Sequence, residues 1–309
     1  MADPDSSLHG TLRVYKRNPN TLVAFTSGPE RPTGGTVVFV PGLTDGPMSL
    51  KYLPALADAL ANANPSWRLV QPVLSSSYLG FGVSDLATDV LELDALLDSI
   101  PPDDGPIALI GHSTGCQDTV AYLRDGAHAD RVVAAVLQAP VSDRQAMALE
   151  CGPEAVAAAA AEAQALVAAG SRERLMPRDT AGVFNTPITA ARYASLAGRN
   201  TPDDMFSSDL TDEELRDRLG RLRGASRRRR ILVVFSGQDE YVPEEVKRNE
   251  NEEKTYGELM RRFADAIGPG EDEEPFVVCL ENGNHALDGA PGIEFASLVV
   301  RAVNGGATR

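Results

Sequence analysis

The sequence predicts an α/β fold, with a mostly parallel, doubly wound β-sheet and one helical insertion. Short apolar runs rich in β-branched residues recur along the chain, and amphipathic segments with helical spacing separate them. The apolar runs are nearly continuous, which is typical of strands covered on both faces of a parallel sheet. Their alternation with helices implies right-handed crossovers. The alternation is interrupted once, between about residues 142 and 226.

The apolar runs define the strands that we expect in this sheet. The predicted strands are residues 36–42, 67–74, 106–112, 131–140, 230–237 and 275–283. Two earlier runs, TLRVYKR and TLVAFTSG, are expected to add an antiparallel pair at one edge. Segments 48–63 and 85–100 carry apolar residues at helical spacing and are predicted to be helices.

The interruption is predicted to be a helical cap or lid. Residues 142–226 would form this insert, and residues 1–141 together with 227–309 would form the core. Within the insert, 153–170 begins with Pro153 and is followed by a second helix capped by Thr211. The alternative is a structural insertion with no gating role.

Composition excludes several classes of partner. The 309 residues carry a net charge of −15, which argues against nucleic acid because phosphate binding needs clustered cations. No apolar stretch is long enough to predict a membrane span, and the first residues show no secretory signal. Three widely spaced cysteines without a CxxC pair suit free thiols in a reducing compartment. We therefore expect a cytoplasmic protein.

The stretch LIGHSTGCQD, residues 109–118, is the strongest functional motif. Gly111 to Gly115 reads G-x-S-x-G, after a predicted strand and before the helical run CQDTVAYLRD. A strand that turns directly into a helix forces its middle residue into unfavourable dihedrals, and flanking glycines leave room for the turn. This context favours Ser113 as a nucleophile over a simple helix cap.

A serine nucleophile needs a base, and the chain has four histidines. His9 lies in the amino-terminal tail and His128 in a polar loop, whereas His112 adjoins the serine and points away from it on a turn. His285 follows the last predicted strand, so it reaches the same sheet edge as Ser113. The alternative for His285 is a purely structural loop histidine.

The base in turn needs an acid to fix its tautomer. Asp239 follows the penultimate predicted strand in VVFSGQDEYVP. Ser113, Asp239 and His285 then follow the nucleophile–acid–base order of α/β-hydrolases. Glu240 is the neighbouring alternative to Asp239, and Asp143 is a weaker one.

Backbone donors for an oxyanion are predicted at two places. One is the N–H of Thr114, and the other is the N–H of Leu43 in VPGLTDG, with Thr44 next. An ordinary glycine turn competes with this reading of VPGLTDG. Thr44, Tyr78 and Gly82 are expected to shape a substrate pocket, although a plain loop role is an alternative for the last two.

These residues favour hydrolysis of a small-molecule carboxylic ester through an acyl-enzyme, with no metal ion or organic cofactor. Acyl transfer or thioester hydrolysis would use the same nucleophile. A third hypothesis, from another class, is a ligand-binding protein on a hydrolase fold.

The chain resembles a family of fungal and plant α/β-hydrolases that includes siderophore esterases acting on fusarinine-type hydroxamate esters. The resemblance covers nearly the whole chain and rests on VPGLTDG, SSSYLGFGVSDLATD, LIGHSTGCQD, FSSDL, SGQDEYVP and GNH. It implies a serine hydrolase with Ser113, Asp239 and His285 as its triad, and it makes a siderophore ester one candidate substrate. Two features depart from the family's pattern. Pro41 stands where many relatives have Gly or His, and the alanine-rich insert does not resemble the family's sequences.

Overall fold

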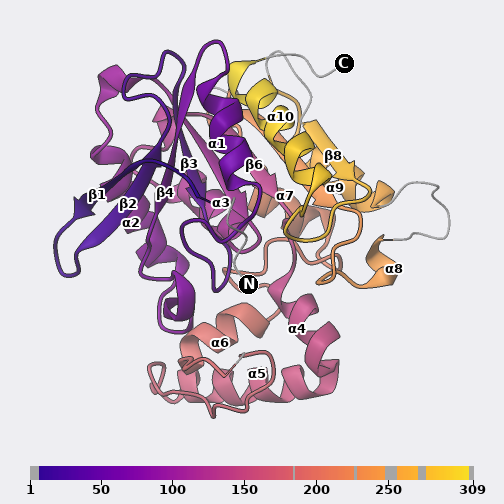
Figure 1. Ribbon diagram of the computed structural model, residues 1–309. Helices are drawn as coiled ribbons and strands as arrows, with labels where there is room; N and C mark the ends of the chain where they lie inside the picture. The colour runs from indigo at the N-terminus through magenta and orange to yellow at the C-terminus, as the bar shows by residue number, and fades with distance from the viewer. Residues whose placement is uncertain (1–6, 184, 226–227, 248–255, 271–275, 306–309) are drawn as a thin grey trace.

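An eight-stranded sheet forms the centre of the computed structural model, which describes residues 7–183, 185–225, 228–247, 256–270 and 276–305 (Figure 1). The strand order is β1-β2-β4-β3-β5-β6-β7-β8, and the strands from β4 to β8 along this order are parallel. The bounds are β1 Thr11–Lys16, β2 Leu22–Ser27, β3 Gly35–Val40, β4 Trp67–Pro72, β5 Ile107–His112, β6 Val132–Gln138, β7 Arg230–Ser236 and β8 Phe276–Leu280. The predicted parallel strands and the antiparallel edge pair β1–β2 are confirmed.

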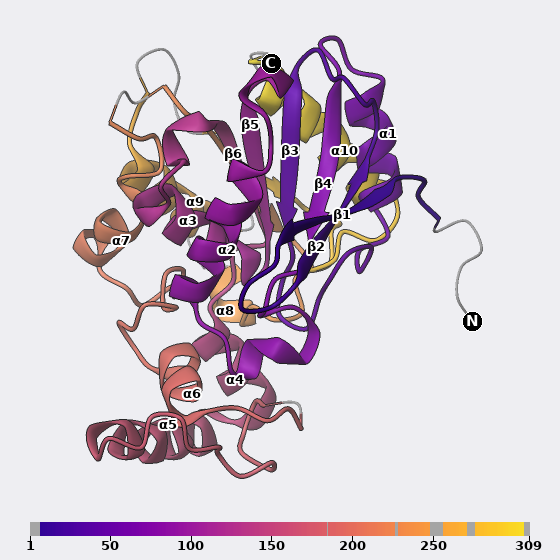
Figure 2. The same ribbon diagram turned by 90° about the vertical axis from the view of Figure 1, so that its left-hand side faces the viewer.

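Helices cover both faces of the sheet, which explains why its strands are apolar throughout. Helices α1 (Leu53–Ala61) and α10 (Ala290–Asn304) pack on one face, and α2 (Leu86–Asp98), α3 (Gly115–Asp125) and α9 (Gly257–Ile267) pack on the other (Figure 2). A short helix, α8 (Glu244–Lys247), follows β7. In the described ranges, no helix combines the length and the apolar character needed to cross a membrane.

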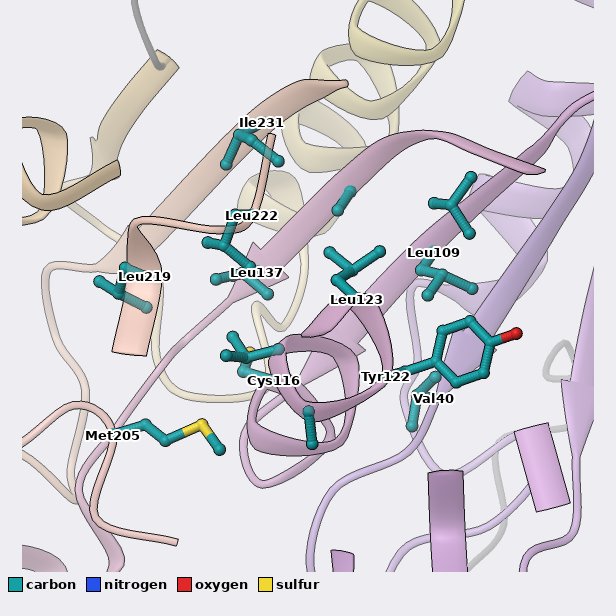
Figure 3. Close-up of a cluster of buried hydrophobic side chains, with 14 of the residues drawn as sticks. Val40, Leu109, Cys116, Tyr122, Leu123, Leu137, Met205, Leu219, Leu222 and Ile231 are labelled. Atoms are coloured by element: carbon teal, nitrogen blue, oxygen red, sulfur yellow. The ribbon is translucent and has the colours of Figure 1, made fainter. Parts of the chain in front are cut away.

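Neighbouring strand residues belong to different apolar layers. Val38 and Val40 point into the layer under α2 and α3, whereas Val37 and Phe39 point into the layer under α1 and α10. Figure 3 shows part of the first layer, where side chains of β3, β5 and β6 meet those of α3. Burying each such side chain contributes roughly 1.5–3 kcal/mol, so both layers hold the strand ends in fixed positions.

Three helices of the segment between β6 and β7 form a separate layer beyond the end of the sheet (Figures 1 and 2). They are α4 (Asp143–Cys151), α5 (Pro153–Ala168) and α6 (Ala190–Ala197). Their apolar side chains form a cluster of their own, to which Phe81 of the core also belongs. The alanine-rich α5 buries only Val156, Ala160 and Ala163, as its small side chains predict.

The last part of the same segment packs differently. Helix α7 (Asp212–Leu219) begins at Thr211 with the predicted cap and packs against α9. Its Leu215 and Leu219 share the sheet-side core with Phe263 of α9. The α4–α6 layer is therefore distinct in packing from α7, and the predicted boundary at 226–227 lies outside the described residues.

A buried arginine joins the α4–α6 layer to the core. Arg192 of α6 donates to the Phe81 carbonyl at 2.9 Å and contacts Asp203 with a nitrogen–oxygen distance of 2.6 Å. Burial raises the pKa of nearby Asp118 of α3 well above its ordinary value, with Asp89 adding to the rise and Arg192 opposing it. The arginine thus offsets the negative charge of several acids that the fold buries.

Replacing Arg192 with methionine should lower the free energy of unfolding by about 3–5 kcal/mol, because it leaves buried carboxylates without their cation. Urea unfolding measures this loss. Arg199→Met is the matched control, since Arg199 pairs with Glu214 at the surface and its loss should change little. Equal losses in the two variants would contradict the role of Arg192.

Candidate active site

A cavity of about 490 Å³ lies beyond the carboxyl ends of the strands. Loops after β3, β5, β6, β7 and β8 contribute to its wall, and α4 and α6 cover it. The lining residues are Leu43, Thr44, Asp45, Ser49, Leu50, His112, Ser113, Val141, Asp143, Ala146, Met147, Glu150, Gly182, Leu196, Glu240, Tyr241, His285 and Ala286. The strand order reverses between β3 and β5, and open α/β sheets bind ligands at such a point.

Ser113 occupies the strained turn that its motif predicts. Its φ is +53°, in the left-handed region that residues other than glycine rarely adopt. A Cβ on Gly111 would lie 2.3 Å from the carbonyl oxygen of Gly115, and one on Gly115 would lie 2.3 Å from that of Val40. The close approach of these backbones requires both glycines and presents Ser113 at the start of α3.

His285 lines the same cavity and forms a hydrogen-bonded pair with Asp239, which lies buried behind it. The distance between His285 Nδ1 and Asp239 Oδ2 is 2.8 Å, and Asp239 is 1% exposed. The other carboxylate oxygen accepts from the Tyr241 N–H at 3.0 Å, which fixes the carboxyl group. An aspartate held in this way fixes the Nδ1–H tautomer of the imidazole and leaves Nε2 free to accept a proton.

The structure brings Ser113 and His285 to one cavity, without a hydrogen bond between their side chains among the described residues. The His285 ring centroid lies 4.9 Å from that of His112, the residue directly before Ser113. The His285 carbonyl also accepts from Gln138 Nε2 at 3.0 Å. Catalytic hydrogen bonds in ligand-free enzymes are often long, so this placement suits a base beside the serine.

The other histidines are placed less well to act as a base. His112 is buried with Nδ1 against Gln138 Oε1, and burial, together with His285, lowers its pKa to about 3. A ring that stays neutral and hydrogen-bonded to Gln138 is poorly suited to accept the proton of Ser113. His9 is exposed near the amino terminus and His128 lies near Asp98, and neither lines the cavity.

The two alternative acids have other partners. Glu240 lines the cavity, and its Oε2 accepts from the backbone N–H of His285 at 2.9 Å, so it contacts the main chain rather than the ring. Asp143, at the start of α4, accepts from Gln117 Nε2 at 2.6 Å. Of these three acids, Asp239 is the one that forms a hydrogen bond with the imidazole ring of His285.

The two predicted oxyanion donors flank the serine. Among the hydrogen bonds of the described residues, the N–H groups of Leu43 and Thr114 donate to no other residue. A Cβ on Gly42 would lie 2.9 Å from the Cβ of Ser113, so the loop after β3 passes close to the serine. Leu43, the next residue, lines the same cavity as Ser113.

The three predicted pocket residues lie at different places. Thr44 lines the cavity, with a φ of +67°. Tyr78 is half exposed with its ring against Gly46, and Gly82 accepts from the Thr189 N–H at 2.9 Å. Tyr78 and Gly82 are not among the described residues that line the cavity.

Several residues of the site were not found by sequence reasoning. Gln138, at the end of β6, contacts both His112 and His285. The sequence feature that could have revealed it is a polar residue at the end of an otherwise apolar strand. Asp45, Glu150 and Tyr241 line the cavity from three separate segments. In the described part of the chain, no group of three His, Cys, Asp or Glu side chains is arranged to hold a metal ion.

Asp143 makes the stability of the protein depend on pH. Burial, with the nearby Asp203 carboxyl, raises its pKa from 3.8 to about 8. Between these values the folded protein holds a proton that the unfolded chain has released, so this group makes stability fall as pH rises. Asn cannot ionise, so Asp143→Asn removes this dependence. As the pH rises from 5 to 8, the free energy of unfolding of the variant should increase by roughly 1–3 kcal/mol relative to that of wild type. Urea unfolding of variant and wild type at both pH values measures this change. A difference in free energy of unfolding that is the same at pH 5 and pH 8 would contradict the raised pKa of Asp143.

Comparison with known proteins places the chain in a family. The model of the family described as "Protein of unknown function (DUF1749)" matches residues 1–304. Esterase AN6793 from Emericella nidulans is 30% identical over 97% of this chain and 92% of that protein. Fusarinine C esterase sidJ from Aspergillus fumigatus is 30% identical over 98% of this chain and 96% of that protein.

A solved structure supports the same grouping. The siderophore hydrolase EstB from Aspergillus fumigatus is 28% identical and superposes with a TM-score of 0.72, covering 98% of both chains. A structure titled "Alpha/Beta hydrolase fold protein of unknown function" superposes with a TM-score of 0.68 at 22% identity. The predicted α/β-hydrolase fold is thereby confirmed, and the chain belongs to the DUF1749 family of proteins.

Proposed function

We propose that the protein is a serine esterase that hydrolyses carboxylic esters through an acyl-enzyme. The observation that carries this proposal is the joint placement of two residues in one cavity wall: Ser113, on its left-handed strand–helix turn, and His285, hydrogen-bonded to the buried Asp239. The esterase names of the two relatives that match nearly the whole chain support it.

In the proposed first half-reaction, His285 Nε2 takes the proton of Ser113 while the serine oxygen attacks the ester carbonyl carbon. The carbonyl oxygen becomes an anion, and the N–H groups of Leu43 and Thr114 donate hydrogen bonds to it. When the carbon–oxygen bond to the alcohol breaks, the imidazolium returns its proton to the departing alkoxide. The acyl group stays on Ser113.

In the second half-reaction, His285 removes a proton from water, and the resulting nucleophile attacks the acyl carbon. The bond to Ser113 breaks, the serine regains its proton from the imidazolium, and the carboxylic acid leaves. Asp239 holds the ring in one tautomer throughout and stabilises its charged form. No step needs a group beyond these residues and water.

A siderophore ester of hydroxamate type is the substrate class that we propose for this site. Two relatives carry the names fusarinine C esterase and siderophore hydrolase. We propose further that residues 142–226 act as a cap, in which α4 and α6 line the cavity and α5 packs against both. The free cysteines Cys116, Cys151 and Cys279 support a cytoplasmic location.

Labelling and turnover test the proposal together. The folded protein is treated with a fluorophosphonate probe and digested, and the adduct is located by mass spectrometry. We expect the adduct on Ser113 and release of hydroxamate acids from fusarinine C. An unlabelled, folded protein that also leaves activated esters intact would favour a ligand-binding protein instead.

A further inference from the structure

The cavity wall is strongly acidic around the candidate triad. Four carboxyl side chains line it, and no lysine or arginine in the described ranges does so. The four are Asp45, Asp143, Glu150 and Glu240. Burial raises the pKa of Asp143 to about 8, so this carboxyl group is mostly uncharged at neutral pH, and the charge of the wall comes from the other three. The basic side chains in the wall are His112, which burial keeps neutral, and His285. The mechanism proposed above uses none of these four carboxyl groups.

Part of this acidic wall lies beside the imidazole. The Tyr241 ring stands edge-on to the His285 ring, with centroids 4.7 Å apart, and Glu240 accepts from the His285 N–H at 2.9 Å. An imidazole that protonates the departing alkoxide must contact the alcohol part of the ester. The alcohol part therefore lies next to Tyr241 and Glu240.

Further carboxylates gather around the same tyrosine. Glu150 reaches the wall from the end of α4, and Asp45 reaches it from the loop after β3. Burial raises the pKa of Tyr241, and Glu240, Glu150, Asp239 and Asp45 each raise it further, as negative groups near a phenol do. Tyr241 is 41% exposed and lines the cavity, so a ligand in the cavity can contact it.

An accessible aromatic ring surrounded by carboxylates attracts cations. Its π-face interacts favourably with an ammonium group, and each carboxylate adds Coulomb attraction. The same wall repels an anionic leaving group.

We propose that the preferred substrates carry a positively charged amine in the alcohol part of the ester, held beside Tyr241 by Glu150 and Glu240. This inference rests on the proposed esterase function. It concerns the specificity of the site, so it can fail while the esterase function stands.

Two matched methylphosphonothioates test the proposal without relying on turnover of any ester. One has a thiocholine leaving group, and the other has the uncharged isostere 3,3-dimethylbutanethiol. With either probe the Ser113 oxygen bonds to phosphorus, the phosphorus–sulfur bond breaks, and the thiol departs with the proton of the serine. Mass spectrometry follows the adduct on Ser113 and gives both rate constants of inactivation.

The cationic probe should react about tenfold faster than its isostere at low ionic strength. This ratio should approach one in about 1 M salt, where the Debye length is about 3 Å. Glu150→Gln should lower the ratio about threefold. Glu154→Gln is the matched control, because Glu154 lies exposed on α5 outside the lining and its loss changes the net charge equally. It should leave the ratio as in wild type.

The two proposals fail in different ways. Adducts on Ser113 at equal rates, or faster with the neutral probe, would overturn the cationic preference and leave the esterase function standing. Equal loss of the ratio in Glu150→Gln and Glu154→Gln would overturn the assignment to the cavity wall. A folded protein that forms no adduct with either probe would overturn the nucleophile, and both proposals with it.

Discussion

Replacing Ser113 with alanine is expected to lower kcat for an activated ester by about 10⁴–10⁶. The substitution removes one oxygen atom, so the turn, with its φ of +53°, and the glycines that shape it keep their packing. His285 is left with no serine hydroxyl to activate. Hydrolysis then depends on water and on the oxyanion donors alone, which accounts for the residual rate.

Initial rates with 4-nitrophenyl acetate measure this loss, with circular dichroism as the check that the variant folds. Ser297→Ala is the control, since this exposed serine of α10 lies outside the cavity lining and bonds only the carbonyl of the preceding turn. It should retain the wild-type rate. Turnover by folded Ser113→Ala within tenfold of wild type would end the serine-esterase proposal.

The sheet could be predicted from the sequence because both of its faces are buried. Each parallel strand is apolar at consecutive positions, so β3, β5 and β6 stand out from the amphipathic helices between them. The same regularity locates the candidate triad. Ser113 directly follows β5, whereas Asp239 and His285 lie in the loops after β7 and β8, and parallel strands bring their carboxyl ends to one edge.

The residues that line the pocket could not be predicted in the same way, because the order of strands in the sheet cannot be read from the sequence. Tyr78 and Gly82 follow β4, as Leu43 follows β3. In the sheet, β4 lies one strand further from β5 than β3 does. The segment after β4 therefore meets the α4–α6 layer, where Gly82 accepts from Thr189.

The acidic wall escaped sequence reasoning for a related reason. Glu150 reaches the cavity from α4, whose position depends on how α4, α5 and α6 pack on one another and on Phe81. An exposed glutamate on a helix has the same local pattern whether it faces solvent or a cavity. Gln138 likewise needs three-dimensional contacts with His112 and His285 to reveal its part in the site.

Exchanging Asp239 for asparagine should lower kcat by about 10⁴ while the protein keeps its fold. Asp239 Oδ2 accepts from His285 Nδ1, so the ring carries its proton on that nitrogen and offers Nε2 as the base. An amide NH₂ at this position donates instead, which forces Nδ1 to accept and puts the proton on Nε2. The ring can then no longer take a proton from Ser113.

Glu240→Gln is the matched control, because it removes the neighbouring carboxylate, which bonds the His285 backbone rather than its ring. On an uncharged activated ester its loss in kcat should be far smaller than that of Asp239→Asn. The two acids are neighbours in the chain, but Asp239 contacts the ring of His285 and Glu240 contacts its backbone. Comparing kcat of the two variants therefore shows which acid orients the imidazole. A larger loss in Glu240→Gln would transfer that role to Glu240 and leave the Asp239–His285 contact a structural one.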